Sequence, residues 1–170
     1  MLRIISSTVD ATLAFTLLAA AQEPVEPDYS AAYGEHLDYT ATLNGTCTRL
    51  IVAGTDATQS CTPHVIVDVF KNSRTGFTFM ESDFALISFS GMGRMQIEDE
   101  PKTFTQPVDT ILFTLIGMGT APNKVKAAGI CTYTYPKSGP VRISCSAHTA
   151  QGQFEATFLI DAQDPTIKQF

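Results

Sequence analysis

The stretch from Cys131 to Cys145, CTYTYPKSGPVRISC, predicts a β-hairpin that is closed by a disulfide. If Cys131 faces Cys145 across two antiparallel strands, Tyr133 faces Ile143, and the two sulfurs lie close enough to bond. The connecting loop, residues 136–140, is rich in proline, serine and glycine. In this register one face of the hairpin collects the side chains expected to be buried: Cys131, Tyr133, Tyr135, Val141, Ile143 and Cys145.

The same spacing occurs once more, from Cys47 to Cys61 in CTRLIVAGTDATQSC. With Cys47 opposite Cys61, Ile51 would pair with Ala57. The alternation of apolar and polar side chains is weaker here than in the later stretch. The turn would then fall on Gly54, Thr55 and Asp56.

These two stretches use all four cysteines of the chain, and sequence alone permits three ways to pair them. We expect Cys47–Cys61 and Cys131–Cys145, and the crossed pairing that joins the two halves of the domain remains open. Closing a loop of about 15 residues stabilises a fold by about 3 kcal/mol. A structural role therefore suffices, and the short C-x-x-C spacing of zinc and redox sites is absent. The repeated spacing also leaves an internal duplication open.

The N-terminus has the features of an export signal. Arg3 precedes an uncharged, mostly apolar run over residues 11–21, and this run ends in three alanines. Such a run is too short to span a bilayer as a helix. We expect a signal peptide over residues 1–21, a flexible tail over 22–36 and a disulfide-stabilised β domain over 37–170, in a periplasmic or secreted protein. A buried N-terminal helix is the alternative.

The remaining sequence is typical of short strands. Several segments alternate apolar and polar side chains with period two, and turn formers separate them. Residues 83–91 and 108–117 are apolar on both faces, which is typical of strands covered on both sides. We expect an all-β fold, a single antiparallel sandwich or barrel of roughly eight to ten short strands. The main strand segments are 64–70, 75–79, 83–91, 108–117 and 152–161.

Composition limits the class of partner. The chain has 170 residues, 44% of them hydrophobic and 16% charged, as expected of one globular domain. Its net charge is −6 at pH 7. Nucleic acid and anionic membrane surfaces require a positive field, so we expect neither as a partner. No later segment resembles a transmembrane helix.

The sequence contains no recognisable catalytic motif. Gly-x-Ser-x-Gly is absent, and the three histidines His36, His64 and His148 lie in unrelated segments. Methionines at 92, 95 and 118 could bind Cu(I), but methionine also fills gaps in cores. The acidic residues 98–100 lack the alternating spacing of a calcium loop, and a solvated turn explains them. We predict no catalytic residue, cofactor or metal.

The expected function is therefore an exported, noncatalytic β domain that binds a protein or an envelope component. Loops on rigid scaffolds carry recognition, so the two hairpin tips are the expected contacts. An alternative is a β-barrel that carries a small apolar ligand, and a third is a secreted hydrolase. The predicted contact residues are Gly54, Thr55, Asp56, Lys137, Ser138 and Gly139.

Overall fold

The computed structural model describes residues 37–82, 85–93, 97–99, 103–115, 122–134 and 139–170. The predicted signal peptide and tail, residues 1–36, lie outside the described residues, as do His36, Tyr135, Lys137 and Ser138.

Nearly all of the described chain is strand. Among the described residues, a short 3-10 helix spans Thr58–Ser60. The strands are β1 (Leu37–Val52), β2 (Thr55–Asp56), β3 (Cys61–Phe70), β4 (Arg74–Glu81), β5 (Ala85–Met92), β6 (Ile97–Asp99), β7 (Thr103–Leu115), β8 (Asn123–Thr134), β9 (Arg142–Thr149), β10 (Gly152–Ile160) and β11 (Thr166–Gln169). The all-β prediction is confirmed, although β6 occupies part of the acidic stretch that the sequence predicts to be a turn.

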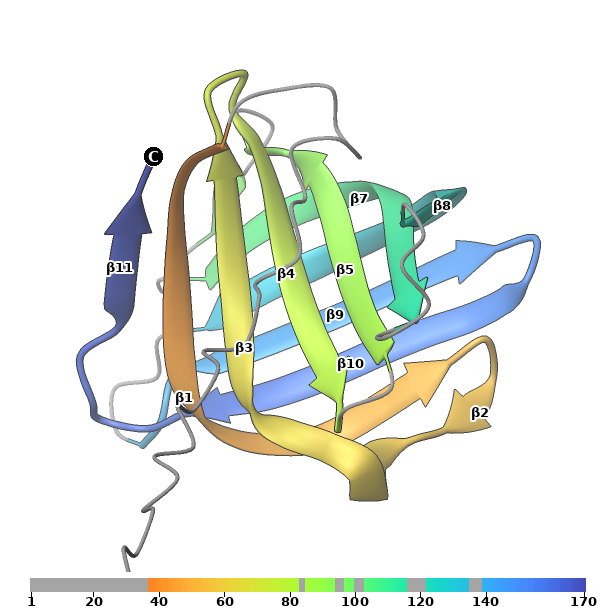
Figure 1. Ribbon diagram of the computed structural model, residues 1–170, viewed down its shortest axis with the longest axis horizontal. Helices are drawn as coiled ribbons and strands as arrows, with labels where there is room; N and C mark the ends of the chain where they lie inside the picture. Colours follow the sequence, from red (N-terminus) through yellow and green to blue (C-terminus); the bar gives the residue numbers. More distant parts are fainter. Residues whose placement is uncertain (1–36, 83–84, 94–96, 100–102, 116–121, 135–138) are drawn as a thin grey trace, which may run out of the picture.

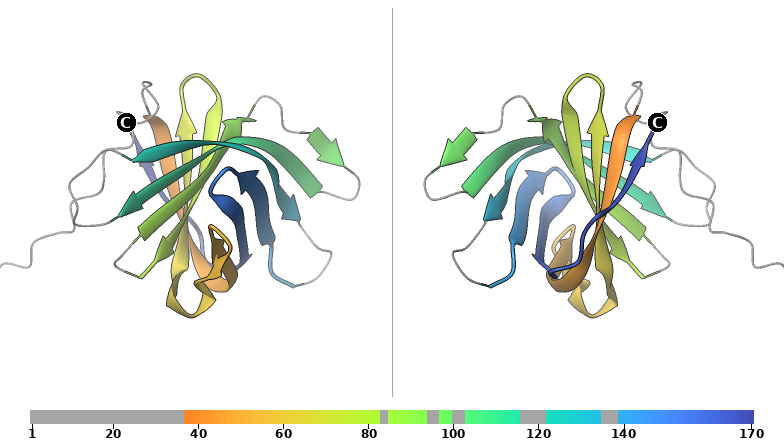
Figure 2. Two further views of the ribbon diagram at one scale, coloured as in Figure 1. Left: turned by 90° about the vertical axis from the view of Figure 1, so that its right-hand side faces the viewer. Right: turned by 90° about the vertical axis from the view of Figure 1, so that its left-hand side faces the viewer.

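Eight of the strands form a closed antiparallel barrel (Figures 1 and 2). They pair in the order β1, β3, β4, β5, β7, β8, β9 and β10, so each strand lies beside the next along the chain. The pairing of β10 with β1 closes the ring. β2, β6 and β11 add to the edges of β1 and β7. Of the two predicted architectures, the structure is therefore the barrel.

Strand β1 makes closure possible because it bends and pairs on both sides. Residues 37–44 pair with β3, whereas residues 45–51 pair with β10, with a bulge between Cys47 and Arg49. Gly45 lies at the change of partner. A Cβ built on Gly45 would lie 2.0 Å from the carbonyl oxygen of Leu159 on β10, so only glycine permits this approach.

The barrel interior is filled by the side chains that the period-two pattern predicts to face inward. Val65 and Val67 of β3 lie opposite Phe79 and Phe77 of β4, as the alternation indicates. Side chains from all eight barrel strands meet in one core, and five of its buried residues are phenylalanines. The fully buried phenylalanines of this core, each at most 1% exposed, are Phe77, Phe79, Phe89, Phe154 and Phe158.

The later disulfide is as predicted. Cys131 of β8 lies directly opposite Cys145 of β9, and Tyr133 lies opposite Ile143. Both cysteines face the barrel interior, where they are 0% and 3% exposed. The bond therefore joins neighbouring strands from the inside of the wall.

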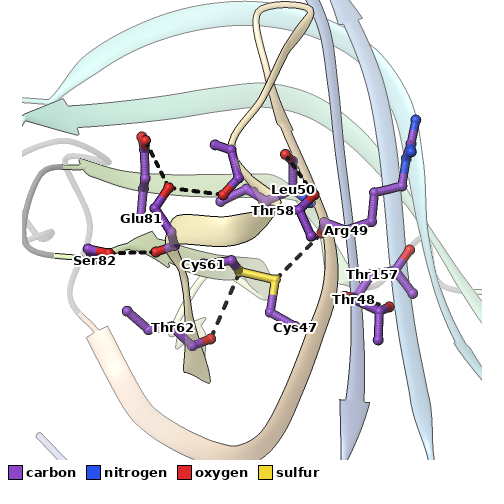
Figure 3. Close-up of a disulfide and its surroundings, with 12 residues drawn as sticks. Cys47, Thr48, Arg49, Leu50, Thr58, Cys61, Thr62, Glu81, Ser82 and Thr157 are labelled. Atoms are coloured by element: carbon purple, nitrogen blue, oxygen red, sulfur yellow. Dashed lines mark hydrogen bonds between the residues drawn. A yellow bond between two sulfur atoms is a disulfide. The ribbon is translucent and has the colours of Figure 1, made fainter.

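The earlier disulfide, Cys47–Cys61, also forms, but the predicted hairpin register around it is wrong (Figure 3). Ile51 pairs with Asp56 rather than with Ala57, and the turn falls on Ala53 and Gly54. Both of these have positive φ, 50° and 86°, which is typical of a tight two-residue hairpin turn. The 3-10 helix Thr58–Ser60 interrupts the ladder between Asp56 and Cys61, and the bulge after Cys47 allows both Cys47 and the fully buried Leu50 to face the core.

The two disulfides should differ in their contribution to stability. Each disulfide joins two cysteines that are 14 residues apart in the sequence. Replacing either pair by alanine removes this cross-link and should lower the free energy of unfolding by about 3 kcal/mol. Replacing Cys131 and Cys145 also removes two buried sulfurs from the core, which should add about 1 kcal/mol. Urea unfolding of the two double variants measures this difference, and an equal or smaller loss for the Cys131/Cys145 variant would contradict it.

Substitution of Gly45 should disrupt barrel closure. We expect Gly45→Ala to lower the free energy of unfolding by about 2 kcal/mol or more, because the new methyl group meets backbone on β10. The matched control is Thr46→Ala at the exposed neighbouring position, which should change stability by less than about 0.5 kcal/mol. Thermal unfolding with the disulfides intact compares the two variants. Equal melting temperatures would show that the backbone at Gly45 does not lie too close to β10 for a side chain.

Candidate functional site

One end of the barrel opens into a cavity of about 540 Å³. This end, called the mouth here, carries the beginnings of β1, β4 and β7 and the ends of β3 and β8. The cavity is lined by Asp38, Tyr39, Val67, Val69, Phe70, Lys71, Ser73, Thr75, Gly93, Phe104 and Tyr133. Most of these side chains come from strands, so the rigid barrel wall holds them in place.

The wall of the cavity is apolar and aromatic, and its rim is polar. Val67 and Val69 of β3 face Tyr133 and Phe104, which come from the other side of the barrel. The ring of Tyr133 packs edge-on against Phe77, with 4.8 Å between the centroids. Because Phe77 is fully buried, the interior beyond it is filled, and the cavity is confined to the mouth.

Hydrogen bonds fix the wall on the β4 side. The carbonyl oxygen of Thr75 accepts a bond of 3.1 Å from the Gln106 amide and one of 3.3 Å from the Ser90 hydroxyl. Gln106 is only 1% exposed, so its hydrogen bond to Thr75 is shielded from water. Hydrogen bonds are stronger in such a low-dielectric environment. This part of the cavity is therefore formed before any ligand enters.

An ion pair ties three strands together on the outer surface. The Arg74 guanidinium of β4 donates two hydrogen bonds to the Asp109 carboxylate of β7, at 2.7 and 3.0 Å, and a third to Ser90 of β5. Partial burial raises the pKa of Asp109, but hydrogen bonds from Arg74 and Thr110 outweigh this, so the pKa lies below its ordinary value. The pair therefore stabilises the fold while Asp109 is ionised.

The contribution of this pair should depend on pH. A carboxyl group whose pKa is lowered by folding adds stability above its unfolded pKa, near 3.9, and loses it as the pH falls through the folded value. Because Asp109 is half exposed, Asp109→Asn should cost only about 0.5–1 kcal/mol at pH 7. In urea unfolding, the free energies of unfolding of the parent chain and of Asp109→Asn should become equal below about pH 3. A difference that stays constant down to pH 2 would contradict this role for ionised Asp109.

Of the predicted contact residues, the structure describes Gly54, Thr55, Asp56 and Gly139. Gly54, Thr55 and Asp56 are exposed at the end away from the mouth, where the Gly54 N–H donates to the Gln153 carbonyl at 2.8 Å. Gly139 is exposed in the β8–β9 connection, at the mouth end. Hydrogen bonds from the Thr58 side chain and backbone N–H hold the pKa of Asp56 below its ordinary value. Gly139, the one described residue of the second predicted loop, therefore lies away from Gly54, Thr55 and Asp56.

The described histidines do not form a catalytic or metal cluster. The His64 ring lies 2.7 Å from the side-chain oxygen of Asn44, and His148 is exposed on the outer wall. Over the described ranges, no group of three or more His, Cys, Asp or Glu side chains could hold a metal ion.

Sequence reasoning missed the cavity as a site, although it placed several of its residues on the inward face. Tyr133 faces inward, as its hairpin register predicts, and Val67 and Val69 of the alternating segment 64–70 line the cavity with it. The period-two pattern cannot indicate that the interior is filled by phenylalanines along most of the barrel and open at one end. The sequence signal for the cavity is a decrease in side-chain size toward the mouth. The pair Val69 and Thr75 is smaller than the pairs of β3 and β4 deeper in the core.

The part of the chain that the structure describes contains no helix long and apolar enough to cross a membrane. Comparison with known proteins adds no relative: no protein-family model, curated protein or solved structure matches the chain.

Proposed function

We propose that this protein is an exported, noncatalytic binding protein whose ligand is a small, largely apolar molecule held in the mouth of the barrel. The observation that carries the proposal is the cavity of about 540 Å³. Its volume falls within the range of about 300–1,000 Å³ that is usual for small-molecule sites. An eight-stranded barrel is also wide enough to hold one small ligand.

The chemistry of the lining suggests an amphipathic ligand. Val69, Phe104 and Tyr133 offer apolar surface inside the cavity, while Asp38, Lys71 and Ser73 offer charge and hydrogen bonds near solvent. A ligand with an apolar body and a polar end would bury the body against the wall and leave the polar end at the rim.

Export is part of the proposal. Two disulfides are compatible with an oxidising compartment, and every cysteine of the described chain is paired. The sequence features of residues 1–21 support the same compartment, which would be the periplasm or the medium.

A second candidate is binding of a protein or an envelope component through the exposed hairpin tips. The exposure of Gly54, Thr55, Asp56 and Gly139 supports it. Lys137 and Ser138 lie outside the described residues, and Gly139 lies at the other end of the barrel from Gly54. The third candidate, a hydrolase, gains no support from the described histidines, because neither hydrogen-bonds a serine hydroxyl.

Filling the cavity should abolish ligand binding without unfolding the protein. We expect Val69→Trp, which places an indole at the mouth, to weaken binding of an apolar fluorescent probe such as anilinonaphthalene sulfonate by about tenfold or more. Fluorescence titration measures the dissociation constant, and thermal unfolding confirms that the variant is folded.

The matched control is Ile130→Trp, which adds the same side chain at a position 49% exposed on the outer wall. This variant should bind the probe as the parent chain does. Equal affinity for the parent chain and Val69→Trp would refute the cavity as the binding site and leave the hairpin tips as the better candidate.

A further inference from the structure

The short strand β11 lies outside the ring of eight barrel strands (Figures 1 and 2). It pairs antiparallel with residues 39–42 of β1, which precede the change of partner at Gly45. β10 pairs with β1 from Gly45 onward, so it does not use this part of the β1 edge. β11 therefore occupies a strand edge that barrel closure leaves open.

β11 is attached by its backbone, while its side chains stay exposed. All four of its residues are exposed. Ile167 is 59% exposed, and Phe170, which follows the strand, is 57% exposed. Burial of large apolar side chains is the main force that holds an element in a fold, and β11 lacks this contribution. Such an edge strand opens locally at a lower free energy than the strands of the barrel wall.

Backbone hydrogen bonds mark the two ends of the segment that can open. The Asp161 N–H donates to the Asn44 carbonyl at 2.9 Å, and the Phe170 N–H donates to the Asp38 carbonyl at 3.1 Å. Every residue from 161 to 170 is exposed. β11 and the linker before it can therefore leave β1 as a unit, while β10 remains in the barrel wall.

The linker between β10 and β11 is long enough to reach another molecule. It comprises residues 161–165, which extend over about 16 Å at about 3.3 Å per residue. Neighbouring strands lie about 4.8 Å apart, so an extended linker carries β11 well beyond the edge of its own β1. The side-chain amide of Asn44 donates to Gln163 at 3.4 Å, a long and weak hydrogen bond that extension of the linker would break.

The register of the β1–β11 ladder indicates which partner fits the edge. Tyr39 lies opposite Gln169, and Thr42 lies opposite Thr166, with no irregularity between them. A second copy of this chain supplies the identical segment. Reciprocal exchange keeps every pair of this ladder and changes only the molecule that supplies β11, so it costs little beyond the association itself.

Exchange also provides cover for apolar side chains that the single chain leaves in water. Successive side chains of a strand point to opposite faces, so Ile167 and Phe170 expose apolar surface on both faces of β11. In an exchanged pair the two barrels lie side by side at their β11 strands, and each covers part of the other's β11. Removal of this surface from water favours the pair.

From these observations we propose that two copies of this chain form a dimer by exchanging β11, so that each β11 pairs with β1 of the other copy. The dimer has two-fold symmetry, as exchange of identical segments requires. Its interface lies beside the mouth, because Asp38 and Tyr39 line the cavity and belong to the stretch of β1 that receives β11. The exchange does not depend on which ligand the cavity holds.

A pair of cysteines placed across β1 and β11 distinguishes exchange from a closed single chain. Thr42 and Thr166 are direct partners in the ladder, so Thr42→Cys together with Thr166→Cys can form a disulfide in either state. We expect the oxidised full chain to migrate as a covalent dimer in gel electrophoresis without reductant and as a single chain after reduction. A new disulfide within one chain, or a dimer that lacks this cross-link, would overturn the proposal.

The matched control is Thr46→Cys together with Leu159→Cys, at partners in the β1–β10 ladder. Because β10 belongs to the wall of its own barrel, this pair should form a disulfide within one chain. Peptide mapping by mass spectrometry assigns each disulfide and confirms that Cys47–Cys61 and Cys131–Cys145 are retained. Covalent dimers in equal yield from both variants would show that the cross-linking is unspecific and would refute the exchange.

Sedimentation velocity gives a second measurement without added cysteines. We expect the full chain to be a dimer that dissociates on dilution, and a chain that ends at Pro165 to stay monomeric at the same concentrations. Circular dichroism checks that the shortened chain is folded, and if it is not, the cross-linking of the full chain decides. A dimer that persists without β11 would place the interface elsewhere. A full chain that is monomeric at every concentration would contradict the exchange.

Discussion

The pairing of β1 with β10 is the constraint on which the rest of the structure depends. Without it, the sheet would have two open edges and an interior exposed along one side. β1 achieves this pairing by changing partner at Gly45, where its backbone approaches the Leu159 carbonyl too closely for any side chain. The bulge between Cys47 and Arg49 then turns Cys47 and Leu50 inward. Closure, the first disulfide and the burial of Leu50 thus have one local cause.

Closure also defines where a ligand could enter. The large rings of Phe77, Phe79, Phe89, Phe154 and Phe158 fill the interior over most of its length. Toward the mouth the inward residues of β3 and β4 become smaller, with Val69 opposite Thr75, and a cavity remains. The hydrogen bond from Gln106 to Thr75 then holds the wall in place.

The two disulfides act on different parts of this arrangement. Cys131–Cys145 joins two neighbouring strands of the wall, whereas Cys47–Cys61 joins the inner side of the β1 bulge to the start of β3. The bond at the bulge therefore fixes the strand that closes the barrel. The equal spacing of the two cysteine pairs conceals this difference, because in the first stretch a 3-10 helix takes the place of a regular ladder.

The sequence by itself determined the strand content, the inward faces of most strands and both disulfides, because these depend on local alternation and on the short separation of each cysteine pair. It predicted the register of the Cys131 hairpin correctly, since no bulge interrupts it. It failed at the Cys47 hairpin, where a 3-10 helix interrupts the ladder and the turn lies on Ala53 and Gly54. Only the tertiary structure decided between barrel and sandwich and left a cavity at the mouth. Each of these depends on which distant strands pair, and β1 and β10 are separated by most of the chain.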